Sequence, residues 1–394
     1  MRVRILHVVE ALGVGGGVET GIANLIETMD SKRFEHLLCA VFRLGTQTQR
    51  YAAGHAQMFC LDQRPRKFAV QTGPIAGLIR TLRPHVVHSR NWGALESVVA
   101  GRWVGGASVI HSEHGVEMDP ASEPHRRTWF RRMGFGLAHR VFCVSGLLAD
   151  LLAARTGFAR CKIAVIHNGV NTNRFRADTQ TRARCRAELG IRADEFCIGC
   201  VGRLSRIKDY PTLLGAAEIF ARNAHSWRLL IVGDGADRPE LEQLVASRPA
   251  LQDRVQFLGA SERVPEFLNA IDTYVLPSLY EGISNSLLEA MATGLPAIAS
   301  EAGGNPEAII DRQSGLLFPV ADREQLADRL LLVYNDPALR SSLGKGALRR
   351  VQQEFSLAAM VAKYEAMYEE LAGANAGRHV TAENLAIESA GGCR

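Results

Sequence analysis

Residues 196–209 read FCIGCVGRLSRIKD, and this stretch decides the fold class. The apolar first half predicts a buried strand that ends near Gly202. The polar second half predicts a loop at the carboxyl end of that strand. Similar apolar runs recur along the chain and alternate with longer helical patterns, which is typical of βαβ units and parallel sheets. The sequence therefore predicts an α/β protein.

The expected strands fall into two groups. The first group lies near residues 3–9, 37–42, 58–61, 86–88, 108–112, 141–144 and 164–166. The second group lies near residues 196–202, 228–232, 255–258, 273–276, 297–300 and 315–318. Since 394 residues exceed what one hydrophobic core usually supports, each group predicts a separate doubly wound domain.

A turn-forming cluster at residues 167–171, followed by a charged stretch to about Arg186, predicts the linker. The expected domains are then residues 1–174 and 187–354. Residues 357–372 carry apolar side chains at helical spacing, including Met360, Tyr364, Met367 and Leu371, and predict a final amphipathic helix. Residues 373–394 are small and polar and predict a flexible tail.

Charge and composition narrow the class further. The net charge is +5, but residues 1–174 carry 22 Lys and Arg against 12 Asp and Glu. Such a basic half favours phosphates or an anionic membrane face, or is simply a solvated surface. We expect a cytoplasmic protein, since we find neither a signal peptide nor an apolar stretch of spanning length. The scattered cysteines predict no disulfides, and Cys197 with Cys200 predicts core packing rather than a zinc site.

Glycines follow the first expected strand and lead directly into a helix. Gly15, Gly16 and Gly17 would let the backbone approach a ligand closely and aim helix N–H groups at an anion. A purely structural turn is the alternative. The dinucleotide fingerprint is incomplete, because Val18 replaces its last glycine and no ribose-binding acid ends the second strand. We expect no nicotinamide cofactor and no other cofactor.

Two cations follow the strand at residues 196–202. Arg203 and Lys208 lie five residues apart in a loop, where they could embrace a diphosphate, although two solvated surface charges would look the same. Gly233 follows the next strand and supplies a second glycine turn. Both loops should lie at the carboxyl edge of the sheet, where α/β sheets bind ligands.

The most specific run is residues 277–296, which read PSLYEGISNSLLEAMATGLP. Glu281 should lie in the loop after a strand, and Glu289 two turns into a helix that Asn285 or Ser286 would cap. Because apolar residues surround Glu289, helix solvation explains it poorly. We expect Glu289 to bind vicinal hydroxyls such as those of a ribose, and Glu281 to bind a sugar ring.

Together these motifs resemble glycosyltransferase family 4, retaining enzymes of the GT-B fold, in which two Rossmann-like domains face each other. The resemblance covers residues 1–372 and extends to sugar transferases of exopolysaccharide and PEP-CTERM systems. It implies that Arg203 and Lys208 hold the donor diphosphate, Glu289 the ribose and Glu281 the transferred sugar.

The same resemblance implies further site residues. Backbone amides at Ile283, Ser284 and Asn285 should meet phosphate and sugar oxygens, and a histidine of the first domain should face the sugar, here His114. The helix at 357–372 should cross back to the first domain. No Asp-x-Asp motif lies in a fitting loop, so we expect no metal.

The implied reaction moves a sugar from a nucleotide diphosphate-sugar, with UDP as the expected nucleotide, to a saccharide or lipid-linked acceptor. A nucleotide-sugar epimerase is the alternative, and it would need acid/base carboxylates such as Glu113 and Glu117. A binding module without catalysis would not need both Glu281 and Glu289. No nucleic-acid partner is expected.

Residues 124–135 read PHRRTWFRRMGF and combine arginines with Trp129 and Phe130. This pattern is typical of helices that lie on anionic membranes, and equally of a surface helix with one buried face. The sequence leaves both interpretations open.

Overall fold

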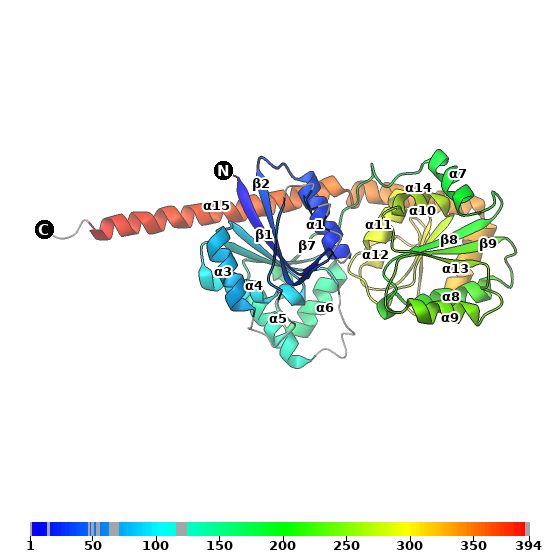
Figure 1. The fold of residues 1–394 in the computed structure, drawn as a ribbon, viewed down its shortest axis with the longest axis horizontal. Coiled ribbons are helices and arrows are strands. Elements are labelled where there is room, and N and C mark those ends of the chain that lie inside the picture. Colours follow the sequence, from blue (N-terminus) through cyan, green and yellow to red (C-terminus); the bar gives the residue numbers. More distant parts are fainter. Residues whose placement is uncertain are drawn as a thin grey trace. The chain divides into compact units, whose positions relative to one another are not determined.

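The computed structural model describes residues 2–13, 16–45, 48, 51–52, 56–62, 71–115 and 124–390, with side chains to Ala374. The chain divides into two compact units (Figure 1). The first comprises Met1–His167 with Met360–Arg394, and the second comprises Asn168–Ala359.

A parallel sheet of seven strands forms the first unit, in the order β3-β2-β1-β4-β5-β6-β7. Its strands are β1 (Val3–Leu12), β2 (Phe34–Leu44), β3 (Gln57–Cys60), β4 (Val86–Arg90), β5 (Ser108–Glu113), β6 (Arg140–Cys143) and β7 (Ile163–Val165). Its helices are α1 (Gly17–Thr28), α3 (Thr72–Leu82), α4 (Glu96–Val104), α5 (His125–Leu137), α6 (Gly146–Thr156) and most of α15 (Leu357–Ala390).

Successive residues of each strand face opposite sides of this sheet. On one side Leu37 and Cys39 of β2 pack with Ile75 of α3. On the other side Leu38 of β2 packs with Ile22 of α1. Helices therefore cover both faces, as expected of a doubly wound sheet.

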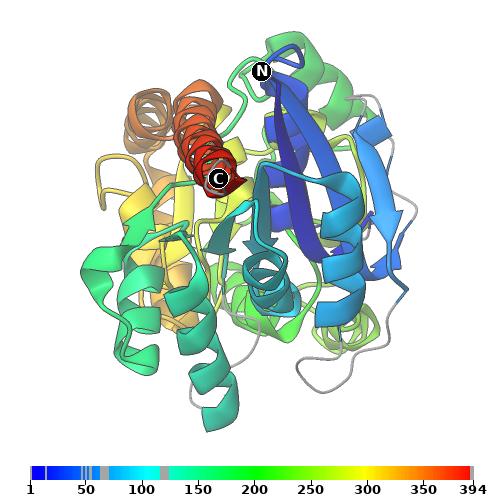
Figure 2. The ribbon, with the colours of Figure 1, turned by 90° about the vertical axis from the view of Figure 1, so that its left-hand side faces the viewer.

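From Met360 onward α15 belongs to the first unit, and Figure 2 looks along it beside the strands. Tyr364 meets Phe142 of β6 edge-on with ring centroids 5.5 Å apart, and Ser108 donates to the carbonyl of Leu371 at 3.0 Å. The buried face includes Tyr368, whereas the sequence had placed Met367 there. The helix also continues beyond residue 372, to Ala390.

A parallel sheet of six strands forms the second unit, in the order β10-β9-β8-β11-β12-β13. Its strands are β8 (Phe196–Val201), β9 (Trp227–Val232), β10 (Val255–Gly259), β11 (Thr273–Leu276), β12 (Ala297–Ser300) and β13 (Leu316–Phe318). Its helices are α7 (Thr179–Glu188), α8 (Tyr210–Phe220), α9 (Arg238–Ala246), α10 (Val264–Ala270), α11 (Asn285–Ala292), α12 (Asn305–Ala308), α13 (Arg323–Asn335) and α14 (Pro337–Glu354). Apolar clusters pack both faces of this sheet.

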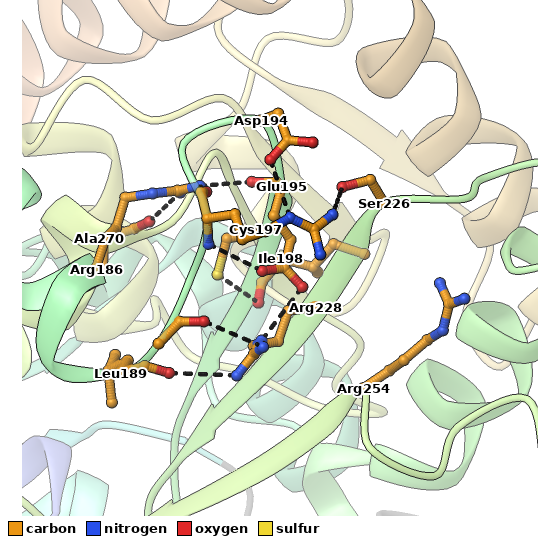
Figure 3. Close-up of polar contacts among 12 residues, drawn as sticks. Arg186, Leu189, Asp194, Glu195, Cys197, Ile198, Ser226, Arg228, Arg254 and Ala270 are labelled. Atoms are coloured by element: carbon orange, nitrogen blue, oxygen red, sulfur yellow. Dashed lines mark hydrogen bonds and ion pairs between the residues drawn. The ribbon is translucent and has the colours of Figure 1, made fainter.

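The charged stretch predicted as a linker is instead part of the second unit, where it forms α7. Arg186 donates to the carbonyls of Ala270 at 2.8 Å and of Glu195 at 2.6 Å (Figure 3). Arg182 forms an ion pair with Asp272 at 2.7 Å. Because these arginines bind groups beside β8 and β11, this unit begins at Asn168 rather than at residue 187.

The predicted α/β class is confirmed, and each expected strand overlaps an observed one. Cys197 and Cys200 pack in different apolar clusters on the two faces of β8, consistent with core packing. Across the described ranges, no helix combines the length and apolar character needed to span a membrane.

Candidate functional site

The carboxyl edge of the six-stranded sheet gathers the candidate residues of the second unit. The chain leaves β8 toward β9 on one side, whereas β11 and β12 lie on the other side of β8. Such a topological switch point is where open α/β sheets leave a crevice for a ligand.

The loops after β8 and β9 are joined through their backbones. Leu204 donates its N–H to the carbonyl of Asp234 at 3.0 Å. A Cβ on Gly233, whose φ is +142°, would lie 1.9 Å from the carbonyl oxygen of Gly202, and one on Gly235 would lie 2.1 Å from that of Leu204. Only glycine fits at these two positions, so Gly233 has a structural reason as well as a predicted role.

A second pair of glycines, which sequence reasoning missed, supports the loop that carries Glu281. A Cβ on Gly303 would lie 1.8 Å from the carbonyl oxygen of Glu281, and one on Gly304 would lie 1.9 Å from that of Gly282. The signal in the sequence was a Gly-Gly pair in the loop after β12, at the same edge of the sheet.

Lys208 and Glu281 are brought together as an ion pair between Nζ and Oε1. Ser278 donates to the same carboxylate oxygen at 2.6 Å, and Leu279 donates its N–H to the carbonyl of Ile207 at 2.8 Å. The two side chains are 20% and 11% exposed, so their charges are partly desolvated. Partial burial strengthens their interaction with any further charged group that enters the site.

Helix α11 begins beside this ion pair. Ser284 caps it by accepting from the N–H of Leu287 at 3.4 Å, which corrects the prediction that Asn285 or Ser286 caps the helix. Asn285 is its first residue, so the amides from Ile283 onward lie at a helix N-terminus, where backbone N–H groups favour anions.

Glu281 and Glu289 share a neighbourhood. Tyr274 donates to Oγ of Ser286 at 2.8 Å, one turn before Glu289 in α11. Burial raises the pKa of Tyr274, and the charges of both carboxylates raise it further. Glu289 is partly exposed between Leu288 and Ala290, which are buried. Arg203 is exposed on the loop that also carries Lys208. The second unit therefore holds all four predicted charged residues at or near one sheet edge.

In the first unit, the predicted glycine turn precedes α1. Gly16 is the N-cap and Gly17 the first residue of that helix, while Gly15 lies outside the described residues. Glu19, two residues after Gly17, accepts the N–H of Gly13 at 2.6 Å. Tyr51 donates to the same carboxylate at 3.3 Å, so Glu19 holds the start of this turn in place.

His114 follows β5 directly. Its N–H donates to Oδ1 of Asn91 at 2.8 Å, and its Nε2 lies 2.9 Å from Oγ of Ser112. Burial, reinforced by the charge of Arg90, lowers the pKa of His114 to about 3. The imidazole is therefore neutral at physiological pH, and it can donate or accept a hydrogen bond depending on its tautomer.

Glu113 points to the opposite face of the sheet. Its Oε1 accepts from Nε of Arg131 at 2.7 Å and lies 3.3 Å from Nε2 of His111. Burial would raise the pKa of Glu113, but Arg131 and His111 outweigh it and lower that pKa to about 2. Glu113 is therefore a buried structural anion, while Glu117 lies outside the described residues.

The arginines of α5 differ in their surroundings. Arg131 is buried against Glu113, Arg127 stacks over Trp92 at 4.6 Å, and Arg132 donates to the carbonyl of Thr156 at 3.0 Å. Trp129 is 60% exposed, and Arg126 is exposed as well. Arg131, one of the arginines of this segment, is therefore a core residue and faces no membrane.

Within the ranges that the structure describes, no cluster of three or more His, Cys, Asp or Glu side chains could hold a metal ion.

Two family models match the chain. The model described as "Glycosyl transferases group 1" matches residues 181–350, and the model described as "Glycosyltransferase Family 4" matches residues 15–174. Together the two matches span more than half of the chain; the first lies within the second unit, and the second lies mostly within the first unit.

Curated relatives agree with these matches. A D-inositol 3-phosphate glycosyltransferase of Streptomyces avermitilis is 29% identical over 287 residues, which are 68% of this chain and 61% of that protein. A UDP-Gal:α-D-GlcNAc-diphosphoundecaprenol α-1,3-galactosyltransferase of Escherichia coli is 27% identical over 286 residues, 71% of this chain and 73% of that one. The match thus spans about three fifths of the first relative's length.

Solved structures share the fold. The Anabaena protein Alr3699/HepE, solved in complex with UDP and glucose, superposes with a TM-score of 0.81 at 20% identity, covering 94% of this chain and 100% of that one.

Proposed function

Since the chain belongs to the group 1, family 4 glycosyltransferases, we propose that it moves a sugar from a nucleotide diphosphate-sugar to an acceptor. The observation that carries the proposal is the meeting of Lys208 and Glu281 beside the N-terminus of α11, at a sheet edge formed by close-packed glycine loops. A cation, an anion and the N-terminal amides of a helix there suit a molecule that carries both phosphates and hydroxyls.

Each group has a proposed role. Lys208 and Arg203 neutralise the diphosphate, whose charge grows as the sugar leaves, and the amides from Ile283 onward add donors. Glu281 binds the hydroxyls of the transferred sugar, and Glu289 binds the ribose. We propose retention of the anomeric configuration, with the leaving phosphate guiding attack from the same face, and no metal.

The nucleotide we propose is UDP, and the acceptor is a saccharide or a lipid-linked saccharide of exopolysaccharide assembly. The Escherichia coli relative, whose name gives a UDP-sugar donor and a diphosphoundecaprenol acceptor, supports this choice. The link to PEP-CTERM systems rests on sequence resemblance alone.

Titration of UDP into matched variants tests the site. Lys208→Met removes the partly buried ammonium group. The change should weaken UDP binding about 10- to 100-fold, because hydrogen bonds to charged groups contribute about 1.5–3 kcal/mol. Arg206→Met removes an equal charge from an exposed position of the same loop and should change affinity less than about threefold. Equal losses in both variants would refute the assigned site.

A variant of Glu281 should distinguish an effect on UDP binding from an effect on sugar transfer. Glu281→Ala should abolish sugar transfer while UDP binding stays within a fewfold of the unmodified protein, because the carboxylate contacts the sugar rather than the nucleotide. Normal transfer by this variant would exclude the proposed role.

The competing epimerase needs an acid or base that can change its protonation state. Glu113 is locked in a buried ion pair with Arg131, an observation that favours the transferase. Donor sugar incubated without acceptor should yield no epimer.

Membrane contact through α5 stays a proposal, supported by the exposed Trp129 and Arg126. The double variant Trp129→Ser, Arg126→Glu should no longer float with anionic vesicles. Trp103→Ser alters a similarly exposed tryptophan of α4 and should still float with them.

A further inference from the structure

One face of the first unit's sheet carries buried polar side chains under α15. His7 of β1, His88 and Arg90 of β4 and Ser112 of β5 are at most 2% exposed. Strand alternation places them on a common face, since His7 pairs with His88 and Arg90 with Ser112 in the parallel register. Buried polar groups are costly unless hydrogen-bonded, so this face should hold a connected network.

The network runs from α15 to His114. Oη of Tyr368 lies 2.7 Å from Nδ1 of His88, and Nε2 of His88 lies 2.9 Å from Oγ of Ser112. Ser112 Oγ in turn lies 2.9 Å from Nε2 of His114. Four side chains therefore form one line of hydrogen bonds that crosses from the last helix to the loop after β5.

Arg90 lies on the same face, and its guanidinium can only donate. Its Nη1 lies 2.8 Å from Nδ1 of His7, which must therefore accept. The phenol of Tyr368 is fully buried, and its oxygen lies 2.7 Å from Nδ1 of His88. A buried O–H needs an acceptor, so the phenol donates its proton to Nδ1 of His88.

Each later member has only one proton to give. His88 accepts at Nδ1, carries its proton on Nε2 and donates to Ser112. The hydroxyl of Ser112 then donates to Nε2 of His114. Because burial and Arg90 keep both histidines neutral, His114 must carry its single proton on Nδ1.

We propose that Tyr368, His88 and Ser112 are positioning residues that fix His114 as the Nδ1–H tautomer, so that it presents a neutral donor to a substrate oxygen. Without the line, the ring could flip or exchange tautomers, and a donor would be offered only part of the time. The tautomer depends on the chain alone, whereas its catalytic consequence rests on the proposed function.

Nitrogen NMR of the ligand-free protein labelled with ¹⁵N-histidine tests the tautomer directly. Two-bond ¹H–¹⁵N correlations distinguish the two neutral forms, and His114→Gln assigns the signal. We expect His114 wholly as Nδ1–H at pH 7. An Nε2–H form would overturn the proposal.

Variants along the line supply the second readout. Ser112→Ala should leave His114 as a mixture of tautomers, Ser112→Thr should restore the Nδ1–H form because it keeps a hydroxyl, and Tyr368→Phe should give a smaller shift. Tyr364→Phe is the matched control, since Tyr364 meets His88 through its ring, with centroids 6.1 Å apart. Equal spectra for the Tyr364 and Tyr368 variants would refute the directed line.

Kinetics separate this idea from the function on which it rests. Ser112→Ala should lower kcat for sugar transfer about tenfold with UDP affinity unchanged, and Ser112→Thr should recover it. If the unmodified chain transfers no sugar while the tautomer pattern holds, the proposed function fails and the positioning stands. If transfer is normal in a variant whose His114 tautomer has changed, the catalytic consequence fails.

Discussion

The two sheets of this molecule use their interiors differently. In the second unit, apolar side chains pack both faces of the sheet, and the groups suited to chemistry lie in loops at its carboxyl edge. In the first unit, fully buried residues of the strands themselves, such as His88 and Arg90, form a polar network beneath α15. One sheet thus acts as a scaffold, whereas the other holds part of the polar machinery within its core.

The strongest test of this contrast is the buried ion pair of the first unit. Arg131→Met removes the cation that pairs with Glu113 and leaves this buried carboxylate beside His111. The change should lower the free energy of unfolding by about 3–5 kcal/mol. Urea unfolding with pulsed hydrogen exchange and peptide-level mass spectrometry would assign the loss to the first unit.

The neighbouring Arg132 supplies the control for that measurement. Its side chain is exposed and donates to a helix-end carbonyl, so Arg132→Met should cost less than about 1 kcal/mol. Similar losses of stability in the two variants would mean that the buried ion pair of Arg131 with Glu113 contributes no more than an exposed arginine does.

The second unit should be most sensitive at its glycine contacts. Gly233→Ala places a Cβ 1.9 Å from a carbonyl oxygen and should cost about 2–4 kcal/mol, through overpacking and backbone strain. Gly294 also has a positive φ, of +78°, but open space around it. Gly294→Ala therefore measures the cost of a positive φ without a contact to another backbone. Urea unfolding of the second unit should show a larger loss of stability for Gly233→Ala than for Gly294→Ala. Equal losses would mean that the close approach of Gly233 to the carbonyl of Gly202 does not matter for stability.

Acid should destabilise the first unit before the second. Burial, followed by the charge of Arg90, lowers the pKa of His36 to about 4 from an ordinary value of 6.5. The unfolded chain binds a proton that the folded chain does not, so stability falls as pH drops from 6.5 toward 4. Between pH 6.5 and pH 5, the protonation of His36 alone should lower the free energy of unfolding by about 2 kcal/mol, since each pH unit contributes about 1.36 kcal/mol.

The pKa values of His7 and His88 are also lowered, again with burial as the first cause, so they add to the same slope. Urea midpoints of each unit at pH 7 and pH 5 would measure it, and His36→Gln should flatten it. A steeper pH dependence in the second unit would reverse the comparison.

Sequence patterns predicted the strands because a buried strand needs a short apolar run, whatever it packs against. They also predicted that Lys208 and Glu281 lie at one edge of the sheet, since loops after parallel strands share that edge. The roles of these residues stay a prediction. The hydrogen-bonded line from His114 to Tyr368 was missed. Its members His88 and Tyr368 are 280 residues apart in the chain, so no local spacing in the sequence indicates their contact.

The remaining misses have similar causes. The charged stretch before residue 187 looked like a linker because its arginines bind backbone carbonyls and an acid of another segment, which composition does not reveal. Gly303 and Gly304 were missed because their role is to admit another loop's backbone, and glycine pairs in ordinary turns look the same.

The smallest predicted effect compares two serine caps, one in each unit. Ser145 caps α6 in the first unit by accepting from Leu148 at 3.2 Å, much as Ser284 caps α11 in the second. Each Ser→Ala change should cost about 1 kcal/mol of stability, because a helix N–H loses its acceptor. Only Ser284→Ala should also weaken UDP binding, by a fewfold, since α11 begins beside the ion pair of Lys208 and Glu281. Calorimetric titration of UDP into both variants decides the matter: equal affinities would mean that the N-terminus of α11 does not contact the nucleotide, and the anion site would then rest on the cationic loop alone.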